Sequence, residues 1–325
     1  MPPIHEKRAY PIAGVTTLDH MQEFSLGSSG LRVSSLGLGT MTWGRDTDSD
    51  DAHTMLMDFV DAGGTVVDTA AGYADGASEV LIGEMVGSAV AREDLVLVTK
   101  AGVRTWRTTR AAVDASRGTI LSNLDSSLER LRTDHVDLLL VQAPDPSTPL
   151  EETASALEIA VSTGRARYVG LSNFPAWQVA ILNSLTRITA TQAEYSLLER
   201  SAERELFPAA AALGVGTMAW SPLGRGVLTG KYRHAAPADS RAASPHLRGF
   251  VEPHMTERAF RIVEALARAA DGLEATPLDV ALAWVTERVD CAVVGPRTPA
   301  QLRTILESRT ELPGVVGQAL DDISV

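Results

Sequence analysis

The sequence has little of several features that define large classes of proteins. It contains one cysteine, Cys291, which excludes an intramolecular disulfide and any multi-cysteine metal site. This cysteine opens the apolar run 291–294, which indicates a buried structural thiol rather than a nucleophile. Basic residues number 29 against 41 acidic residues, and the net charge of −12 argues against general binding to nucleic acids or anionic membranes.

Long apolar segments are also scarce. The longest uncharged run covers residues 206–224, but two prolines and two glycines interrupt it. Its two halves have the pattern of a helix end followed by a strand, so we do not expect a membrane span. The first twenty residues contain no apolar core of signal-peptide length, which favours a cytoplasmic protein with residues 1–20 as a loose leader.

Short apolar runs alternate with amphipathic segments through the rest of the chain. After a predicted hairpin over 24–33, the apolar runs end near Thr40, Asp68, Lys100, Gln142, Ser172, Gln192, Trp220 and Gly295. Amphipathic segments follow a helical period over 51–62, 78–90, 116–132, 151–163, 177–185, 202–213, 256–270 and 298–308. Apolar residues make up 45% of the chain, which is enough for a sizeable core.

This alternation predicts a (β/α)₈ barrel with an N-terminal β-hairpin and long loops at its C-terminal mouth. The strands are nearly continuous apolar runs, as expected for a parallel sheet covered by helices. A doubly wound sheet is the alternative, but no G-x-G-x-x-G motif follows an early strand, and residues 37–40 resemble that motif only superficially. No linker divides residues 21–325, which we expect to form one catalytic domain.

An acid, a phenol and an amine follow the ends of two neighbouring strands. Asp68 ends one apolar run, Tyr73 follows five residues later, and Lys100 ends the next run. Because strand ends of a barrel converge on one mouth, we expect these side chains to meet. A lysine cation favours a phenolate, so Lys100 is expected to lower the pKa of Tyr73 and make it a proton donor. The structural alternative is an Asp68–Lys100 ion pair that only joins two strands.

Together with these residues, several longer motifs resemble the aldo-keto reductases over about residues 23–308. The motifs are Asp68-Thr69-Ala70 with Tyr73, Glu79 and Ile82-Gly83; Thr99-Lys100; the helix pattern 116–131; and the segments 169–174, 192–198, 220–224 and 294–298. The loop motifs are most similar to the branch that holds bacterial sugar and general carbonyl reductases and potassium-channel β subunits.

The resemblance implies a nicotinamide cofactor, NADPH/NADP⁺ with NADH as the alternative, bound in extended form across the barrel mouth. It implies a small-molecule carbonyl substrate and no metal, with Tyr73 as proton donor tuned by Asp68 and Lys100. The expected cofactor contacts are Gly39, Thr40, Met41 and Asp68 at the mouth; Ser172, Asn173 and Gln192 at the carboxamide; Trp220 against the nicotinamide ring; Ser221, Leu223, Gly226 and Lys231 at the pyrophosphate; and Gly295, Arg297 and Gln301 at the adenosine. Trp43 and Trp106 are expected to form apolar walls of the substrate pocket beside Tyr73. The oligomeric state stays open.

One position departs from the family pattern. The fourth strand normally ends in a histidine that helps to form the oxyanion site, and Gln142 stands there instead. Glutamine is neutral at every pH but keeps an N–H donor, so it can still serve a developing oxyanion. Three functions therefore stay open: carbonyl reduction, reduction of a C=C bond conjugated to a carbonyl, and NADPH binding as a ligand or sensor with little turnover.

Two cation-rich stretches complete the sequence signals. The first covers residues 224–253 and contains Arg225, Lys231, Arg233, Arg241 and Arg248. We interpret this stretch as a flap over the cofactor pyrophosphate rather than as a solvated loop, and we expect Lys231 and Arg241 to contact the pyrophosphate. By the same resemblance, Arg297 stands where family members often place a residue against the 2′-phosphate, so we expect NADPH over NADH. In this branch Glu-Asn usually follows about one turn beyond Gln301, and this chain has Thr304-Ile305 there. The second stretch contains Arg104, Arg107, Arg110 and Arg117 and is either a solvated loop or a site for an anionic substrate.

Overall fold

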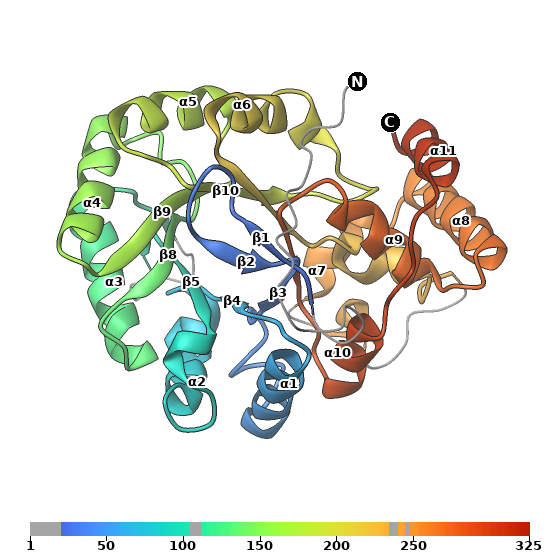
Figure 1. Cartoon of the computed structure of the whole chain (residues 1–325), viewed down its shortest axis with the longest axis horizontal. Helices are drawn as coiled ribbons and strands as arrows, with labels where there is room; N and C mark the ends of the chain where they lie inside the picture. The colour runs from blue at the N-terminus through green and yellow to red at the C-terminus, as the bar shows by residue number, and fades with distance from the viewer. Residues whose placement is uncertain (1–20, 105–111, 234–239, 245–246) are drawn as a thin grey trace.

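The computed structural model describes residues 21–104, 112–233, 240–244 and 247–325. At its centre, eight parallel strands form a closed barrel in the order β10-β11-β12-β3-β4-β5-β8-β9 (Figure 1). The strands are β3 (Leu36–Gly39), β4 (Val66–Asp68), β5 (Val96–Ala101), β8 (Val136–Val141), β9 (Ala166–Ser172), β10 (Ala190–Glu194), β11 (Gly216–Trp220) and β12 (Cys291–Val294). The predicted (β/α)₈ barrel is confirmed, and every predicted strand end lies within two residues of an observed one.

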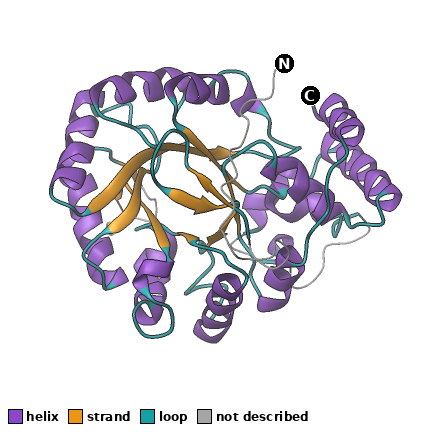
Figure 2. Ribbon diagram, in the orientation of Figure 1, coloured by secondary structure: helices purple, strands orange, loops and turns teal. Residues whose placement is uncertain are grey.

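Helices surround the barrel (Figure 2). They are α1 (Ser49–Asp61), α2 (Ala77–Met85), α3 (Arg117–Leu131), α4 (Leu150–Ser162), α5 (Ala176–Leu185), α6 (Leu206–Leu213), α7 (Arg248–Val251), α8 (Glu257–Gly272), α9 (Pro277–Thr286), α10 (Pro299–Leu306) and α11 (Gly314–Ser324). None of the helices in the described ranges is long and apolar enough to cross a membrane.

Some helix boundaries differ from the prediction. The helix expected over 78–90 ends at Met85, because Val86 is extended and Gly87 has a φ of +74°. The helix expected over 202–213 begins only at Leu206, after a separate 3₁₀ turn at Ser201–Glu203. Helix α9 was not predicted, since its sequence is apolar on most sides and lacks a clear amphipathic period.

The predicted N-terminal hairpin closes one end of the barrel. Its strands β1 (Glu23–Ser25) and β2 (Arg32–Ser34) pair antiparallel. Leu26, Leu31 and Val33 of the hairpin pack against the inward-facing side chains of the barrel strands, and Cys291 is one of these buried residues. The prediction that the cysteine is buried is therefore confirmed.

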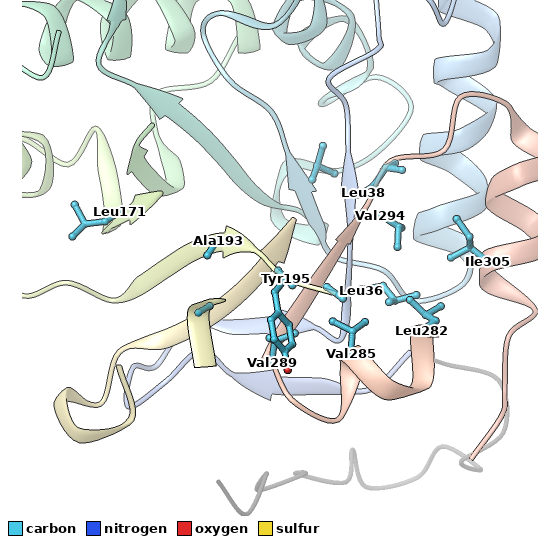
Figure 3. Packing of buried hydrophobic residues seen from close by; sticks show 14 of the residues in the cluster. Leu36, Leu38, Leu171, Ala193, Tyr195, Leu282, Val285, Val289, Val294 and Ile305 are labelled. Atoms are coloured by element: carbon cyan, nitrogen blue, oxygen red, sulfur yellow. The ribbon is translucent and has the colours of Figure 1, made fainter. Parts of the chain in front are cut away.

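A second apolar layer lies between the strands and the helices and is the larger part of the core. Figure 3 shows part of it, with strand residues Leu36, Leu38 and Val294 near helix residues Leu282, Val285 and Ile305. Full burial of one such side chain contributes about 1.5–3 kcal/mol. This packing fixes the strand ends that carry the polar residues of the mouth.

Candidate active site

The three residues predicted to form a proton donor lie together at the mouth of the barrel. Lys100 Nζ lies 2.5 Å from Asp68 Oδ1 and 3.3 Å from the Tyr73 hydroxyl, and it donates to the carbonyl oxygen of Thr69 at 2.9 Å. Asp68 and Lys100 are each only 3% exposed. The ion pair therefore includes the phenol as a third member and does more than join strands β4 and β5.

The pKa of Tyr73 differs from the sequence-based prediction. Burial, the largest influence, raises this pKa above its usual 10.0, and the positive charge of Lys100 opposes the rise only in part. Burial would lower the pKa of Lys100, but the negative charge of Asp68 and its hydrogen bond raise it above 10.5. The prediction of a lowered Tyr73 pKa is wrong, because it counted the lysine charge and not the loss of solvent around the phenol. At neutral pH the phenol keeps its proton.

Glu79, a residue of the strongest sequence motif, forms hydrogen bonds on the outer side of strand β5, behind the site. Its buried carboxylate accepts a hydrogen bond from Thr99 Oγ1 at 2.6 Å and another from Arg130 Nε at 2.8 Å. Thr99 precedes Lys100 on β5, and successive side chains of a strand point to opposite faces. Glu79 thus holds the outer face of β5 against α2 while Lys100 points toward the mouth.

Amide side chains at the mouth contact Asp68 on one side and Trp220 on the other. Gln192 Nε2 donates to Asp68 Oδ2 at 2.7 Å, so both oxygens of this carboxylate are engaged. Asn173, at a φ of +63°, donates from Nδ2 to the carbonyl oxygen of Gln142 at 3.0 Å and accepts from Trp220 Nε1 at 2.9 Å. Sequence reasoning assigned Gln192, Asn173 and Trp220 only to the cofactor and missed these contacts among them.

The side chain of Gln142 is not held by the protein in the same way. Its backbone N–H donates to the carbonyl oxygen of Ala101 at 2.9 Å, but its buried Oε1 has no hydrogen-bond partner among the described residues. The carboxamide lies at the same cavity as Tyr73 and Lys100. Its Oε1 can therefore accept a hydrogen bond from a bound molecule.

A cavity of about 230 Å³ opens beside these residues. Its lining comprises Gly39, Thr40, Met41, Thr42, Asp68, Tyr73, Lys100, Gln142, Ser172, Asn173, Gln192, Trp220, Ser221, Phe250, Val293 and Gly295. All but Thr42, Phe250 and Val293 were predicted site residues. A side chain at Gly39 would be crowded here, because a Cβ at this position would lie 3.0 Å from Val293 Cγ1.

The aromatic wall of this cavity differs from the prediction. Trp43 is fully buried in the core and does not line the cavity, because its large ring is packed inward against other apolar side chains. The prediction that Trp43 lines the substrate pocket is wrong, and Trp106 lies outside the described residues. Phe250 forms an aromatic wall instead, and its ring stacks on Trp220 with 6.4 Å between centroids. The only signal for Phe250 was its place in the stretch predicted to cover the cofactor.

Arg225 attaches the segment that carries Phe250 to the barrel. Its Nε and Nη2 atoms donate to the two oxygens of Glu194 at 2.8 and 2.7 Å, and its Nη1 donates to the carbonyl oxygen of Phe250 at 2.5 Å. Burial would raise the pKa of the Glu194 carboxyl, but hydrogen bonds from His254 and Arg225 hold it below its usual value. The positive charge of Arg225 is therefore matched by a protein carboxylate.

A second cavity of about 330 Å³ continues from the first, and the two share Ser221 and Gly295. It is lined further by the predicted residues Leu223, Gly226, Lys231, Arg297 and Gln301, and by Thr304 and Ile305. Ser221 has a φ of +54°, a conformation unusual for a residue with a side chain and frequent at functional sites. The Arg241 side chain lies outside the described residues. The joined cavities can accept an extended molecule with anionic groups beside Lys231 and Arg297.

Comparison with known proteins agrees with this geometry. A profile of the Aldo/keto reductase family matches residues 35–324. The chain is 34% identical over 321 residues to the Uncharacterized oxidoreductase YrpG of Bacillus subtilis (strain 168), covering 93% of this chain and 96% of that protein. It is 30% identical over 296 residues to the Aldo-keto reductase YhdN of the same organism, covering 88% of each. It is 33% identical over 315 residues to a Probable voltage-gated potassium channel subunit beta of Arabidopsis thaliana, covering 93% and 95%.

The chain therefore belongs to the aldo/keto reductase family. Its relatives include proteins named as oxidoreductases and proteins named as channel subunits, as the sequence motifs predicted. Membership supports an oxidoreductase, in a family that generally uses nicotinamide cofactors.

Proposed function

We propose that the protein reduces an aldehyde or a ketone to an alcohol with NADPH. The observation that carries this proposal is the Asp68–Lys100–Tyr73 arrangement at the wall of a cavity, with Lys100 Nζ 3.3 Å from the phenol oxygen. NADPH, when bound, supplies the hydride that is added to the carbonyl carbon. The protein must then supply a proton and stabilise the negative charge that develops on the carbonyl oxygen.

Tyr73 is the proton donor in this proposal. Its raised pKa keeps the phenol protonated before the reaction, and Lys100 stabilises the phenolate after the proton has left. Asp68 and Gln192 hold the ammonium group in place through their hydrogen-bonded chain. Gln142 donates its amide N–H to the same carbonyl oxygen, in the role that a histidine has in much of the family.

The residues present fit the cofactor. The two joined cavities extend from Asp68 and Gln192 at one end to Arg297 and Gln301 at the other, which suits an elongated dinucleotide. Ser172, Asn173 and Gln192 offer polar groups for the carboxamide, and Lys231 and Arg297 offer positive charge for phosphates.

The proposal is tested by mixing the purified protein with NADPH and a panel of aldehydes, ketones, dicarbonyls and enones. We expect loss of the near-ultraviolet absorbance of the reduced nicotinamide and an alcohol as product. Oxidation only with enones, giving the saturated ketone, would replace the proposal by C=C reduction. NADPH binding without oxidation by any member of the panel would favour a sensor or regulatory subunit.

The pH dependence of reduction tests the roles of Gln142 and Tyr73. We expect kcat/KM to stay level from about pH 6 to pH 9, because an amide does not titrate there and the phenol loses its proton only above pH 10.0. In Gln142→His the rate should rise as the pH falls through about 6.5, where the imidazole becomes a cationic donor. Gln318→His on the exposed surface is the matched control. An acidic limb in the wild-type profile would contradict these roles.

Cofactor preference tests the role of Arg297. We expect NADPH to bind about 10- to 100-fold more tightly than NADH, since a hydrogen bond to a charged group is worth about 1.5–3 kcal/mol. Arg297→Ala should remove most of this difference and leave NADH affinity almost unchanged. Arg303→Ala, which removes a solvent-exposed arginine of the following helix α10, is the control. Equal dissociation constants for the two cofactors in the wild type, measured by titration calorimetry, would overturn the assignment.

A further inference from the structure

The backbone that follows Tyr73 directly is strained. Ala74, with φ of +48° and ψ of +42°, and Asp75, with φ of +55° and ψ of +34°, are both left-handed, and Gly76 follows at a φ of +91°. Residues with a side chain seldom adopt this conformation, and they normally do so singly. Such a turn persists only where its surroundings hold it in place. It leads away from the phenol that lies 3.3 Å from Lys100 Nζ.

The side chain of Arg130, a residue of helix α3, lies against this turn. A Cβ at the buried Gly76 would lie 2.8 Å from both Cδ and Nε of Arg130, so the arginine fills the space in which a side chain would stand. Helices α2 and α3 contact each other and are neighbours in the ring (Figure 1). They approach so closely that a Cβ at Gly83 of α2 would overlap the carbonyl oxygen of Arg130. The backbone and the side chain of Arg130 are therefore both placed against α2 and the turn that precedes it.

The carboxylate of Glu79 holds the Arg130 side chain in this position. Glu79 lies in the first turn of α2 and is fully buried. Arg130 Nε donates to Glu79 Oε2 at 2.8 Å, and Arg130 Nη2 lies 2.7 Å from the same oxygen. Glu79 Oε1 accepts from Thr99, which precedes Lys100 on β5. One carboxylate thus connects the arginine beside the turn after Tyr73 to the strand that carries Lys100.

The start of the same loop has separate anchors. The backbone N–H of Ala71 donates to the carbonyl oxygen of Lys100 at 3.1 Å, and that of Tyr73 donates to the carbonyl oxygen of Ala70 at 3.0 Å. Loss of the Arg130 side chain would leave both hydrogen bonds in place. The loop should then stay attached to β5 while the strained turn relaxes, and the phenol should be displaced without unfolding of the loop.

We propose that Arg130 is a positioning residue for Tyr73. It fills the space beside Gly76 and, through Glu79, holds the strained turn at the distance from β5 that brings the phenol to Lys100. This inference rests on the proposed function, in which Tyr73 gives its proton to the carbonyl oxygen. A displacement of about 1 Å by a residue far from the chemistry can lower a rate about 100-fold. Arg130 does not line the cavity, and it nevertheless sets kcat in this way.

A second pair of arginine and carboxylate on β5 supplies a matched control. Arg92 Nη2 donates to Asp137 Oδ2 at 2.7 Å, and the same oxygen accepts from the backbone N–H of Leu97. The two arginine side chains are similarly exposed, 18% for Arg92 and 26% for Arg130. Leu97 lies near the start of β5, whereas Lys100 lies near its C-terminal end. Arg92→Ala therefore removes a comparable ion pair at the opposite end of the same strand.

Steady-state kinetics with a carbonyl substrate test the proposal first. Arg130→Ala should lower kcat about 10- to 100-fold, because the phenol is displaced from Lys100. The dissociation constant of NADPH should change less than about twofold, since the proposed cofactor contacts are distant from Arg130. Arg92→Ala should keep kcat within about threefold of the wild type. An equal loss of kcat in the two variants would overturn the proposal.

A double variant separates positioning from stability. Arg130→Ala alone leaves the buried Glu79 carboxylate without its cation and should destabilise the fold. Glu79→Gln added to Arg130→Ala removes that lone charge and keeps an oxygen for Thr99, so resistance to urea should recover. The activity should not recover, because the space beside Gly76 stays unfilled. Recovery of kcat together with stability would show that Arg130 only neutralises Glu79, and the proposal would be wrong.

Fluorine NMR reports the position of the phenol without any turnover. With 3-fluorotyrosine incorporated at position 73 alone, Arg130→Ala should shift or broaden the fluorine resonance, and Arg92→Ala should leave it in place. If the wild type reduced no carbonyl, the proposed function would be rejected, and this resonance would still decide whether Arg130 positions Tyr73. A resonance that Arg130→Ala does not move, or that both variants move equally, would overturn the proposal.

Discussion

Replacement of Tyr73 by phenylalanine is expected to lower kcat/KM for carbonyl reduction by roughly 10²- to 10⁴-fold, the range that a general acid contributes. The substitution removes only the hydroxyl that lies 3.3 Å from Lys100 Nζ and leaves the ring in place. The cofactor contacts proposed at Ser172, Asn173 and Arg297 are untouched, so the dissociation constant of NADPH should change less than about twofold.

Two measurements separate this effect from a general loss of structure. Tyr168→Phe removes a phenol on strand β9, away from the cavity lining, and should keep wild-type turnover. Titration calorimetry with NADPH should show that Tyr73→Phe still binds the cofactor. Turnover in Tyr73→Phe equal to that of Tyr168→Phe would exclude Tyr73 as the proton donor.

The barrel and the meeting of Asp68, Tyr73 and Lys100 were predictable from the sequence. Most of the predicted strands are short apolar runs followed by a polar residue, and the rule that strand ends converge on one mouth needs no further information. The side-chain contacts between these strand ends were harder to predict from the sequence. That Gln192 donates to Asp68, and Asn173 accepts from Trp220, depends on how strands distant in sequence are placed in the closed barrel.

The wrong predictions concern side chains whose direction or surroundings depend on tertiary packing. Trp43 lies just beyond a strand end, and nothing in the local pattern tells whether its ring turns into the core or toward the mouth. Phe250 reaches the cavity because Arg225 and Glu194, which are distant in sequence, hold its segment there. The sign of the Tyr73 pKa shift depends on how completely solvent is excluded, and the loop sequence does not contain that information.

Removal of either member of the Asp68–Lys100 pair is expected to destabilise the fold by about 3–5 kcal/mol, because it leaves an uncompensated charge in a buried position. In Lys100→Met the carboxylate keeps only the neutral donor of Gln192, and in Asp68→Asn the ammonium group loses its counter-ion. Urea unfolding at pH 7 measures both losses. Arg303→Met, which breaks a partly exposed pair with Asp58, should cost far less.

The double variant separates charge burial from chemistry. Asp68→Asn with Lys100→Met removes both charges, so its loss of stability should be smaller than the sum of the two single losses, by more than about 1 kcal/mol. Its carbonyl reduction should stay as low as that of Lys100→Met, since the group beside Tyr73 is still missing. The pKa of Lys100 is raised in the folded protein, so the stability that its charge contributes is present below pH 10.5 and is lost only as the pH rises through the folded-state pKa. If the single losses simply added in the double variant, the two side chains would act independently, and Asp68 could not be the residue that keeps Lys100 charged beside the phenol.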